Sequence, residues 1–217
     1  MGLFRGILNL LFPPRCAFCR KITGSGTNAV CDDCQNNLPR TTDGGRQSGD
    51  YYTACYSPLY YEDRVRDSIL MFKFSSRSGY APVYGRYIAE CITENLEGKY
   101  DLISWVPLSE ERLKSRGYDQ AMLLALSTAL ELGDVAVETL TKHLDVPAQS
   151  GIGSEENRRA NISGAYMASD EELIKDKRIL LVDDIVTTGS TLSECAKVLL
   201  EAGADEVLCV TLAKTRE

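Results

Sequence analysis

The stretch that most constrains the fold is RILLVDDIVTTGSTLSE, residues 178–194, in which an apolar run is followed by two acids and a cluster of threonine, glycine and serine. The run RILLVDD predicts a buried strand, and TLSECAKVLLEAG predicts a helix that ends at Gly203. The next segment, EVLCVTLA, predicts a second strand. Strand, helix and strand in succession imply a right-handed crossover between two parallel strands.

The same alternation begins earlier in the chain. DLISWVP (residues 101–107) predicts a strand, residues 109–131 are mostly helical in pattern, and VAVETL (residues 135–140) predicts another strand. Upstream, apolar spacing predicts a helix from Glu62 and a second in YAPVYGRYIAECITENL, while YYTACYSPLYY suggests a strand or hairpin arm. The sequence therefore predicts an α/β domain whose parallel sheet is covered by helices on both faces.

Four of the eight cysteines form two CxxC pairs, CAFC and CDDC, separated by eleven residues. Each pair places two thiolates on one tight turn, and two such turns can supply the four sulfurs of a tetrahedral Zn²⁺ site. Zinc binding of roughly 10 to 16 kcal/mol can fold a segment too small to fold unaided. We therefore predict a structural zinc site; two disulfide bonds, which need an oxidising compartment, are the alternative. The predicted ligands are Cys16, Cys19, Cys31 and Cys34.

A polar linker, TTDGGRQSG at residues 41–49, follows this cysteine-rich segment. We place a zinc-ribbon domain at residues 1–46 and the α/β domain at residues 50–217. The remaining cysteines stand among apolar neighbours and are interpreted as small core residues rather than nucleophiles. They are Cys55, Cys91, Cys195 and Cys209.

The formal net charge of −7 argues against a protein that coats nucleic acid by bulk electrostatic attraction. Residues 1–46 nevertheless carry six Lys or Arg against three Asp, which leaves a local basic contact open. No run of 18 apolar residues occurs, so we expect no membrane insertion. The first residues lack the cleavage site of a signal peptide, and we expect a cytoplasmic protein.

The turn after the two acids is suited to an anion, because helix N-termini have unpaired N–H groups, glycine allows close approach and hydroxyls add donors. The acids suit sugar hydroxyls or a hydrated Mg²⁺, so a ribose 5-phosphate meets both demands. The alternative is an N-capped core helix beside solvated acids. Thr191 and Glu194 predict a capping box at the start of the helix. The turn comprises Thr187, Thr188, Gly189, Ser190 and Thr191, and the acids are Asp183 and Asp184.

This stretch resembles the phosphoribosyl pyrophosphate (PRPP) motif of type I phosphoribosyltransferases. Together with the CxxC pairs, it makes the chain similar to the ComF family of double-zinc-ribbon, phosphoribosyltransferase-like proteins. The resemblance implies a type I phosphoribosyltransferase-like parallel sheet flanked by helices, with a small N-terminal zinc ribbon. Further matching segments are LFPPRCAFC, DSILMFKF (residues 67–74), VPLSEERLKSRGYDQA (residues 106–121), Gln149, RRAN (residues 158–161) and GAY (residues 164–166).

The resemblance also implies roles for individual residues. The turn at residues 106–108 would cradle pyrophosphate, and residues 142–164 would close over the ribose as a mobile loop. Mg²⁺ would accompany PRPP. For Arg112 and Arg116 the alternative is a solvated helix face, and the single histidine, His143, is expected to be solvated. The implied catalytic residues are Asp183, Asp184 and Arg158, and the implied PRPP-binding residues are Asp183, Asp184, Thr187, Thr188, Gly189, Ser190, Thr191, Pro107, Arg112 and Arg116.

Two functions follow from this resemblance. The first is a phosphoribosyltransferase that displaces pyrophosphate from PRPP with a nitrogen nucleophile, linked to DNA uptake and natural transformation. The second is a binding module that senses PRPP or a related nucleotide and contacts single-stranded DNA or a helicase-like partner through its zinc ribbon.

Overall fold

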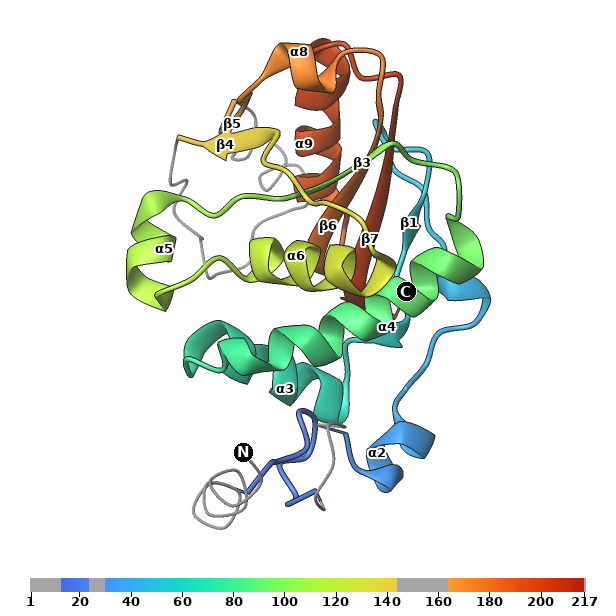
Figure 1. The fold of residues 1–217 in the computed structure, drawn as a ribbon, viewed down its shortest axis with the longest axis vertical. Helices are drawn as coiled ribbons and strands as arrows, with labels where there is room; N and C mark the ends of the chain where they lie inside the picture. Colours follow the sequence, from blue (N-terminus) through green and yellow to red (C-terminus); the bar gives the residue numbers. More distant parts are fainter. Residues whose placement is uncertain (1–12, 24–29, 144–163, 217) are drawn as a thin grey trace.

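The computed structural model describes residues 13–23, 30–143 and 164–216. Its main sheet has the strand order β1-β7-β6-β3, with β2 also pairing with β7, and every pairing is parallel (Figure 1). A separate antiparallel pair joins β4 to β5. The strands are β1 (Cys55–Tyr56), β2 (Leu59–Tyr60), β3 (Leu102–Trp105), β4 (Leu140–Lys142), β5 (Tyr166–Ala168), β6 (Arg178–Val186) and β7 (Glu206–Lys214).

Helices cover both faces of this sheet, as predicted. On one face α4 and α6 pack against strands of the sheet, and on the other face α9 does so. None of the helices in the described segments combines the length and apolar character needed to cross a bilayer. The helices are α2 (Asp32–Asn37), α3 (Asp63–Phe74), α4 (Ala81–Asn95), α5 (Glu110–Arg116), α6 (Gln120–Leu132), α8 (Glu171–Ile174) and α9 (Ser190–Glu201), with 3-10 turns at η1 (Asp43–Gly45) and η2 (Ser78–Tyr80).

Alternation along β6 divides the core into two clusters, because successive side chains of a strand point to opposite faces. Leu180 and Val182 belong to the cluster beneath α4 and α6, whereas Ile179 and Leu181 belong to the cluster beneath α9. The buried strands therefore read as continuous apolar runs, which is typical of a sheet covered on both sides.

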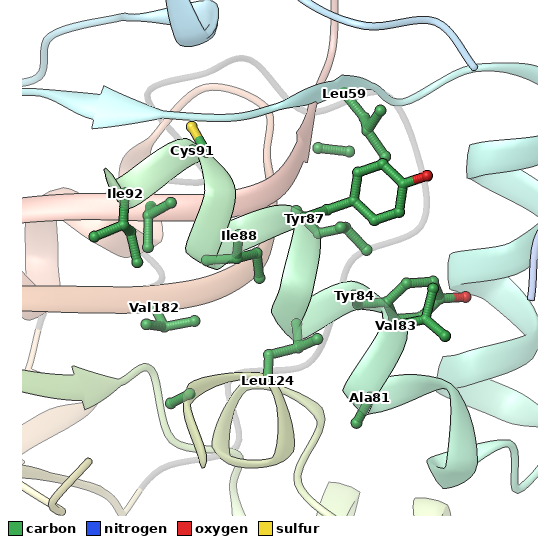
Figure 2. Packing of buried hydrophobic residues seen from close by; sticks show 14 of the residues in the cluster. Leu59, Ala81, Val83, Tyr84, Tyr87, Ile88, Cys91, Ile92, Leu124 and Val182 are labelled. Atoms are coloured by element: carbon green, nitrogen blue, oxygen red, sulfur yellow. The ribbon is translucent and has the colours of Figure 1, made fainter. Parts of the chain in front are cut away.

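The contact between α4 and α6 is close because α4 has a glycine at the crossing. A Cβ atom at Gly85 would lie 2.6 Å from Cβ of Ser127. Figure 2 shows Tyr84, Ile88 and Ile92 of α4 in the cluster that also includes Leu124 of α6.

Two details differ from the sequence-based expectation. Residues 135–140 do not form a full strand of the main sheet: Ala136 makes a single parallel bridge to Ile103, and the extended segment that follows becomes β4. The helical stretch 109–131 is divided into α5 and α6 at Gly117, which has φ +82° and ends α5. Both differences arise where the chain changes direction. The hydrophobic pattern of a sequence shows which residues are buried, but it does not show where the chain turns.

The cysteine-rich segment packs directly on the α/β body. Phe18, between the first two predicted zinc ligands, is 2% exposed, and its ring centre lies 5.7 Å from that of Tyr84 and 5.6 Å from that of Tyr87. Tyr84 in turn contacts Phe72 of α3 at 5.3 Å. The first knuckle is thus continuous with the core cluster beneath α4 and α6.

We expect Phe18→Ala to lower the free energy of unfolding by about 3 to 5 kcal/mol, the usual cost of deleting a buried phenyl group. Urea denaturation would measure the loss. Phe74→Ala is the matched control, because that ring is 66% exposed and its removal should cost about 1 kcal/mol or less. Equal losses in the two variants would contradict the packing described for Phe18.

Candidate functional site

The adjacent strands β3 and β6 form a topological switch point. They pair in parallel, with Trp105 opposite Val182. After β3 the chain passes through α6 and returns to the sheet at Ala136, which pairs with β3 on the side away from β6. After β6 the chain passes through α9 on the other face and returns as β7, on the side of β6 away from β3. Because the two connections leave in opposite directions, their loops diverge at the carboxyl ends of the strands, where open parallel sheets bind ligands.

The turn after β6 is the first wall of this site. Gly189 lies in the left-handed region with φ +77°, and a Cβ atom there would meet Oη of the buried Tyr52 at 2.5 Å. Thr188 and Thr187 are exposed, and the hydroxyl oxygens of Thr188 and Ser190 are 2.8 Å apart. The turn therefore places hydroxyl groups at the N-terminus of α9, where backbone donors and the helix dipole favour an anion.

The predicted capping box at this helix is wrong. The N-cap is Gly189, which has no capping side chain. Glu194 instead accepts a hydrogen bond from the backbone N–H of Gly164, with an N···O distance of 2.9 Å. A partner 30 residues away in the chain thus replaces the local one, and Glu194 ties α9 to the segment that precedes β5.

The two acids lie within β6, as predicted, and the strand extends two residues beyond the predicted end, to Val186. By strand alternation Asp184 points to the α3 side, and there its Oδ1 lies 2.9 Å from Nζ of Lys73. The side chains of Lys73 and Asp184 are only 19% and 10% exposed. Asp183 points to the α9 side, and its Oδ1 accepts the backbone N–H of Asp184 at 2.7 Å.

The electrostatics of the two acids differ. Burial raises the pKa of Asp183, and the neighbouring charge of Asp184 raises it further, while Lys73 acts against both. A carboxyl group with a raised pKa is neutral over a wider pH range and donates or accepts hydrogen bonds. Asp184, paired with Lys73, lies on the α3 side of the switch point.

The turn after β3 is the second wall, and it includes the predicted pyrophosphate turn. The backbone N–H of Leu108 donates to Oδ2 of Asp119 at 2.8 Å, so the acid that caps α6 also shapes this turn. Pro107 is buried. Ser109 is 2% exposed, and its hydroxyl has no hydrogen-bond partner within the described segments. A buried polar atom without a partner among the described residues calls for an explanation.

The two predicted arginines lie on α5, which follows this turn. Nη1 of Arg116 donates to Oε1 of Gln120 at 2.6 Å, and its guanidinium lies 5.1 Å from the ring centre of Phe74. Burial lowers the pKa of Arg116, and the charge of Asp184 opposes that shift. Arg112 is half-buried. Burial raises the pKa of Tyr166 in β5, and the positive charge of Arg112 acts in the opposite direction. Neither arginine lies on a fully solvated helix face.

Part of the predicted site lies outside the described residues: Arg158 and residues 144–163 of the proposed mobile loop. At its edge, Nζ of Lys142 donates to the Tyr166 hydroxyl at 3.1 Å. His143 is exposed, as expected, and its Nε2 lies 3.0 Å from Oγ1 of Thr141.

Sequence reasoning missed Lys73, Ser109, Asp119 and Tyr52 as members of this site. Lys73 appears in the sequence as one of several charges on α3, and Tyr52 as one of many aromatics in a strand-like run. Only Asp119 carries a local signal, because it stands where an N-cap precedes an apolar helix.

The four predicted zinc ligands do come together. Their sulfur atoms all lie within 4.8 Å of one another, and those of Cys19 and Cys31 are 3.5 Å apart. A zinc tetrahedron with Zn–S bonds of about 2.3 Å requires sulfur separations of about 3.8 Å, whereas a disulfide bond is only about 2.05 Å long. The cluster therefore fits a structural zinc site with four thiolates, which leaves no open position for catalysis.

Backbone donors prepare one of these thiols for metal binding. Burial raises the pKa of Cys16, but the N–H groups of Cys19, Cys31 and Phe18 outweigh it and lower the pKa to about 7. The other four cysteines are buried core residues, as predicted, and burial raises the pKa of each; they are Cys55, Cys91, Cys195 and Cys209.

Two family models match the chain: a phosphoribosyl transferase domain at residues 118–217 and a double zinc ribbon domain at residues 7–47. Similarity to solved structures is more distant. Adenine phosphoribosyltransferase from Thermoanaerobacter pseudethanolicus is 18% identical, with 65% of this chain and 83% of that chain covered and a TM-score of 0.40. Glutamine PRPP amidotransferase from B. subtilis is 21% identical, with 63% and 26% covered and a TM-score of 0.39.

Characterised relatives match over most of the chain. Competence protein F of Haemophilus influenzae is 27% identical, with 92% of this chain and 96% of that protein covered. Competence protein ComFC of Bacillus subtilis is 28% identical, with 87% and 78% covered. DNA utilization protein YhgH of Escherichia coli K12 is 32% identical, with 70% of both chains covered. With its zinc ribbon joined to a type I phosphoribosyltransferase fold, the chain belongs to the ComF family.

Proposed function

We propose that this protein binds PRPP at the switch point, between the turns after β3 and β6, and transfers its phosphoribosyl group to a nitrogen nucleophile. The observation that carries the proposal is the switch point itself: the loops after β3 and β6 begin side by side, at the carboxyl ends of paired strands. One loop has a hydroxyl-rich turn with Gly189, and the other has the buried Ser109 hydroxyl, which has no hydrogen-bond partner among the described residues. A sugar that carries phosphoryl groups at both ends matches two such walls.

Each wall has a role in this proposal. The 5-phosphate accepts hydrogen bonds from the turn at residues 187–191, and the ribose hydroxyls donate to Asp184. Asp183 accepts the backbone N–H of Asp184 and so helps to hold it in place. The pyrophosphate lies against residues 106–109, where Ser109 donates to it and Arg112 and Arg116 offset its charge. Arg158, outside the described residues, would add a further positive charge.

The reaction is a substitution at C1 of the ribose. The acceptor nitrogen forms a bond to C1 as the bond from C1 to the pyrophosphate oxygen breaks; pyrophosphate leaves with the electron pair, and the proton of the acceptor nitrogen passes to solvent. Donors that face the developing negative charge accelerate such a step. Mg²⁺, when bound, would neutralise charge on pyrophosphate.

The residues present suit an Mg²⁺ ion that arrives with its substrate. Within the described segments, the cysteine cluster is the one group of three or more potential metal ligands. Mg²⁺ commonly takes one or two carboxylates together with substrate phosphates and waters, and Asp184, on the α3 side of β6, offers one carboxylate. We therefore place Mg²⁺ on PRPP rather than in a site built by the protein alone.

We further propose that this activity serves the uptake or use of DNA in the cytoplasm. The names of the relatives, competence proteins and DNA utilization proteins, support that role. A second candidate is a non-catalytic PRPP sensor that contacts single-stranded DNA or a helicase-like partner through its zinc ribbon. Lys21 at 66% side-chain exposure favours it, because a basic side chain there is accessible.

One experiment separates these functions. The purified protein is titrated with PRPP and Mg²⁺ in a calorimeter and then assayed for pyrophosphate release with a panel of nucleobases and other amines. We expect micromolar binding and base-dependent release. PRPP binding without pyrophosphate release would reject the enzyme proposal and favour the sensor. If PRPP did not bind, both proposals would be rejected. Charge reversal at Arg15, Arg20 and Lys21 then tests the ribbon: the sensor proposal requires weaker DNA binding with unchanged PRPP affinity.

We expect Asp184→Asn to weaken PRPP binding more than Asp183→Asn does. Asp184 lies on the α3 side of the switch point and pairs with Lys73, whereas Asp183 points toward α9. A lost hydrogen bond to a charged group costs about 1.5 to 3 kcal/mol, or roughly 10- to 150-fold in affinity. Calorimetry on the two isosteric variants gives the comparison, and a larger effect at Asp183 would contradict the assignment of faces.

A further inference from the structure

Helix α3 touches the zinc centre with its first half. Nη1 of Arg64 lies 3.5 Å from Sγ of Cys34 and donates to Oδ2 of Asp33 at 2.7 Å. One turn later, the buried hydroxyl of Ser68 donates to the backbone carbonyl of Ala17 at 2.5 Å. Cys34 and Ala17 belong to the two cysteine knuckles, so α3 contacts both of them.

The last turn of the same helix touches the proposed ribose-phosphate site. Lys73 makes the ion pair with Asp184 described above. It follows Arg64 by nine residues, which places it half a turn around the helix and about 14 Å along its axis. Figure 1 shows α3 between the cysteine-rich segment and the sheet. Arg64 of this helix contacts the cysteine cluster, and Lys73 contacts the acid at the carboxyl edge of the sheet.

The helix between these ends is held as one body. Val65, Ile69 and Phe72 have no exposed surface, and the hydroxyl of Tyr118 donates to the backbone carbonyl of Phe72. Close packing of this kind transmits displacement instead of absorbing it. A shift of the ribbon that moves the first half of α3 consequently moves Lys73 as well.

The position of Lys73 matters because its partner is buried beside a second acid. An unpaired charge at Asp184, next to Asp183, would be costly in this partly dehydrated place. The ion pair with Lys73 offsets the charge of the Asp184 carboxylate and fixes its orientation. If Lys73 were displaced, the Asp184 carboxylate would lose its orientation or form a hydrogen bond with another group.

We propose that α3 couples the zinc centre to the ribose-phosphate site, with Lys73 as the positioning residue. The metal-loaded knuckles hold Arg64 and Ser68, these residues fix α3, and α3 holds Lys73 against Asp184. This coupling rests on the proposed function, because PRPP is its ligand. It adds that the zinc ribbon is required for full PRPP affinity, although the two residues that link the sites, Arg64 and Lys73, are about two and a half helical turns apart.

The test uses the zinc-loaded full-length protein and PRPP with Mg²⁺ as the calorimetric ligand. Arg64→Ala with Ser68→Ala leaves the four thiols in place, and added zinc keeps the cluster loaded; metal analysis verifies this. We expect the double variant to bind PRPP about 5- to 150-fold more weakly, the usual range for coupled sites. Arg66→Ala is the matched control, because Arg66 is an exposed arginine of the same helix that pairs with its neighbour Asp67, and it should bind as the unaltered protein does.

Lys73 provides the second arm. Lys73→Met should weaken binding, and Lys73→Arg should restore most of it, because the charge and the approximate reach are retained. In the Lys73→Met background the Arg64 and Ser68 substitutions should have little further effect, since their influence passes through Lys73. Additive losses, or full affinity in the zinc-loaded Arg64 and Ser68 variant, would overturn the coupling.

Hydrogen exchange gives a readout that needs no ligand. Amides of residues 182–189, along the end of β6 and its turn, should exchange faster in the Arg64 and Ser68 variant than in the Arg66 control. If PRPP fails to bind even the unaltered protein, the proposed function falls, and the exchange rates alone decide the coupling. Unchanged exchange would then reject it.

Discussion

Replacing Cys34 with alanine is expected to remove zinc from the protein and to unfold its N-terminal knuckles. The four sulfurs converge within 4.8 Å, and three thiolates cannot complete the tetrahedral site. The binding energy at risk is roughly 10 to 16 kcal/mol, far more than such a small segment can replace by packing. Metal analysis and limited proteolysis of residues 13–40 would show the loss directly.

The loss should also extend into the α/β body. Ala17, Phe18 and Cys34 belong to the core cluster beneath α4 and α6, so unfolding of the knuckles exposes the aromatic surface of Tyr84 and Tyr87. Cys91→Ala is the matched control, because Cys91 is a buried cysteine that is not one of the four predicted zinc ligands. It should retain zinc. Full zinc occupancy in Cys34→Ala, or equal loss in both variants, would contradict the assignment.

The second large effect is expected from Gly189→Val, which should weaken PRPP binding by about 10² to 10⁴. A β-branched residue at φ +77° is strained, and its Cβ would overlap the Tyr52 hydroxyl at 2.5 Å, so the turn must move. Each donor withdrawn from a charged ligand costs about 1.5 to 3 kcal/mol, and the loss of two gives the stated range. Calorimetry with PRPP measures it.

Two controls separate strain from steric overlap. Gly133→Val introduces the same residue at φ +71° with open space around it, at the end of α6. That variant should lose stability but keep its PRPP affinity. Gly189→Ala combined with Tyr52→Phe should bind better than Gly189→Ala alone, because the next atom of the ring is 3.5 Å away. Equal affinity of these last two variants would refute the role of Tyr52.

The local features of this protein could be predicted because short-range patterns determine them. The apolar run of β6, the helix α9 and the strand β7 follow from periodicity within about 35 residues of chain. The zinc ligands follow from two-residue spacing, since each CxxC pair defines a tight turn whatever surrounds it. The same holds for burial of the four other cysteines among apolar neighbours.

Predictions failed where a local pattern admits more than one partner. Thr191 and Glu194 have the spacing of a capping box, but Glu194 accepts the N–H of Gly164 instead. Residues 135–140 have the composition of a strand, yet only Ala136 bridges to the main sheet. In both cases the local pattern shows which contacts a residue is able to make. Which contact forms is decided by residues far away in the chain.

What the sequence by itself determined is therefore the set of elements, the metal ligands and an anion-compatible turn beside two acids. The tertiary structure alone decided which acid points to the α3 side of β6, that Lys73 pairs with Asp184, that Asp119 shapes the turn after β3, and that Tyr52 packs against Gly189. The physical reason is sequence separation. These partners are far apart in the chain or on different elements, so their contacts exist only once packing of the helices on the sheet has set the distances.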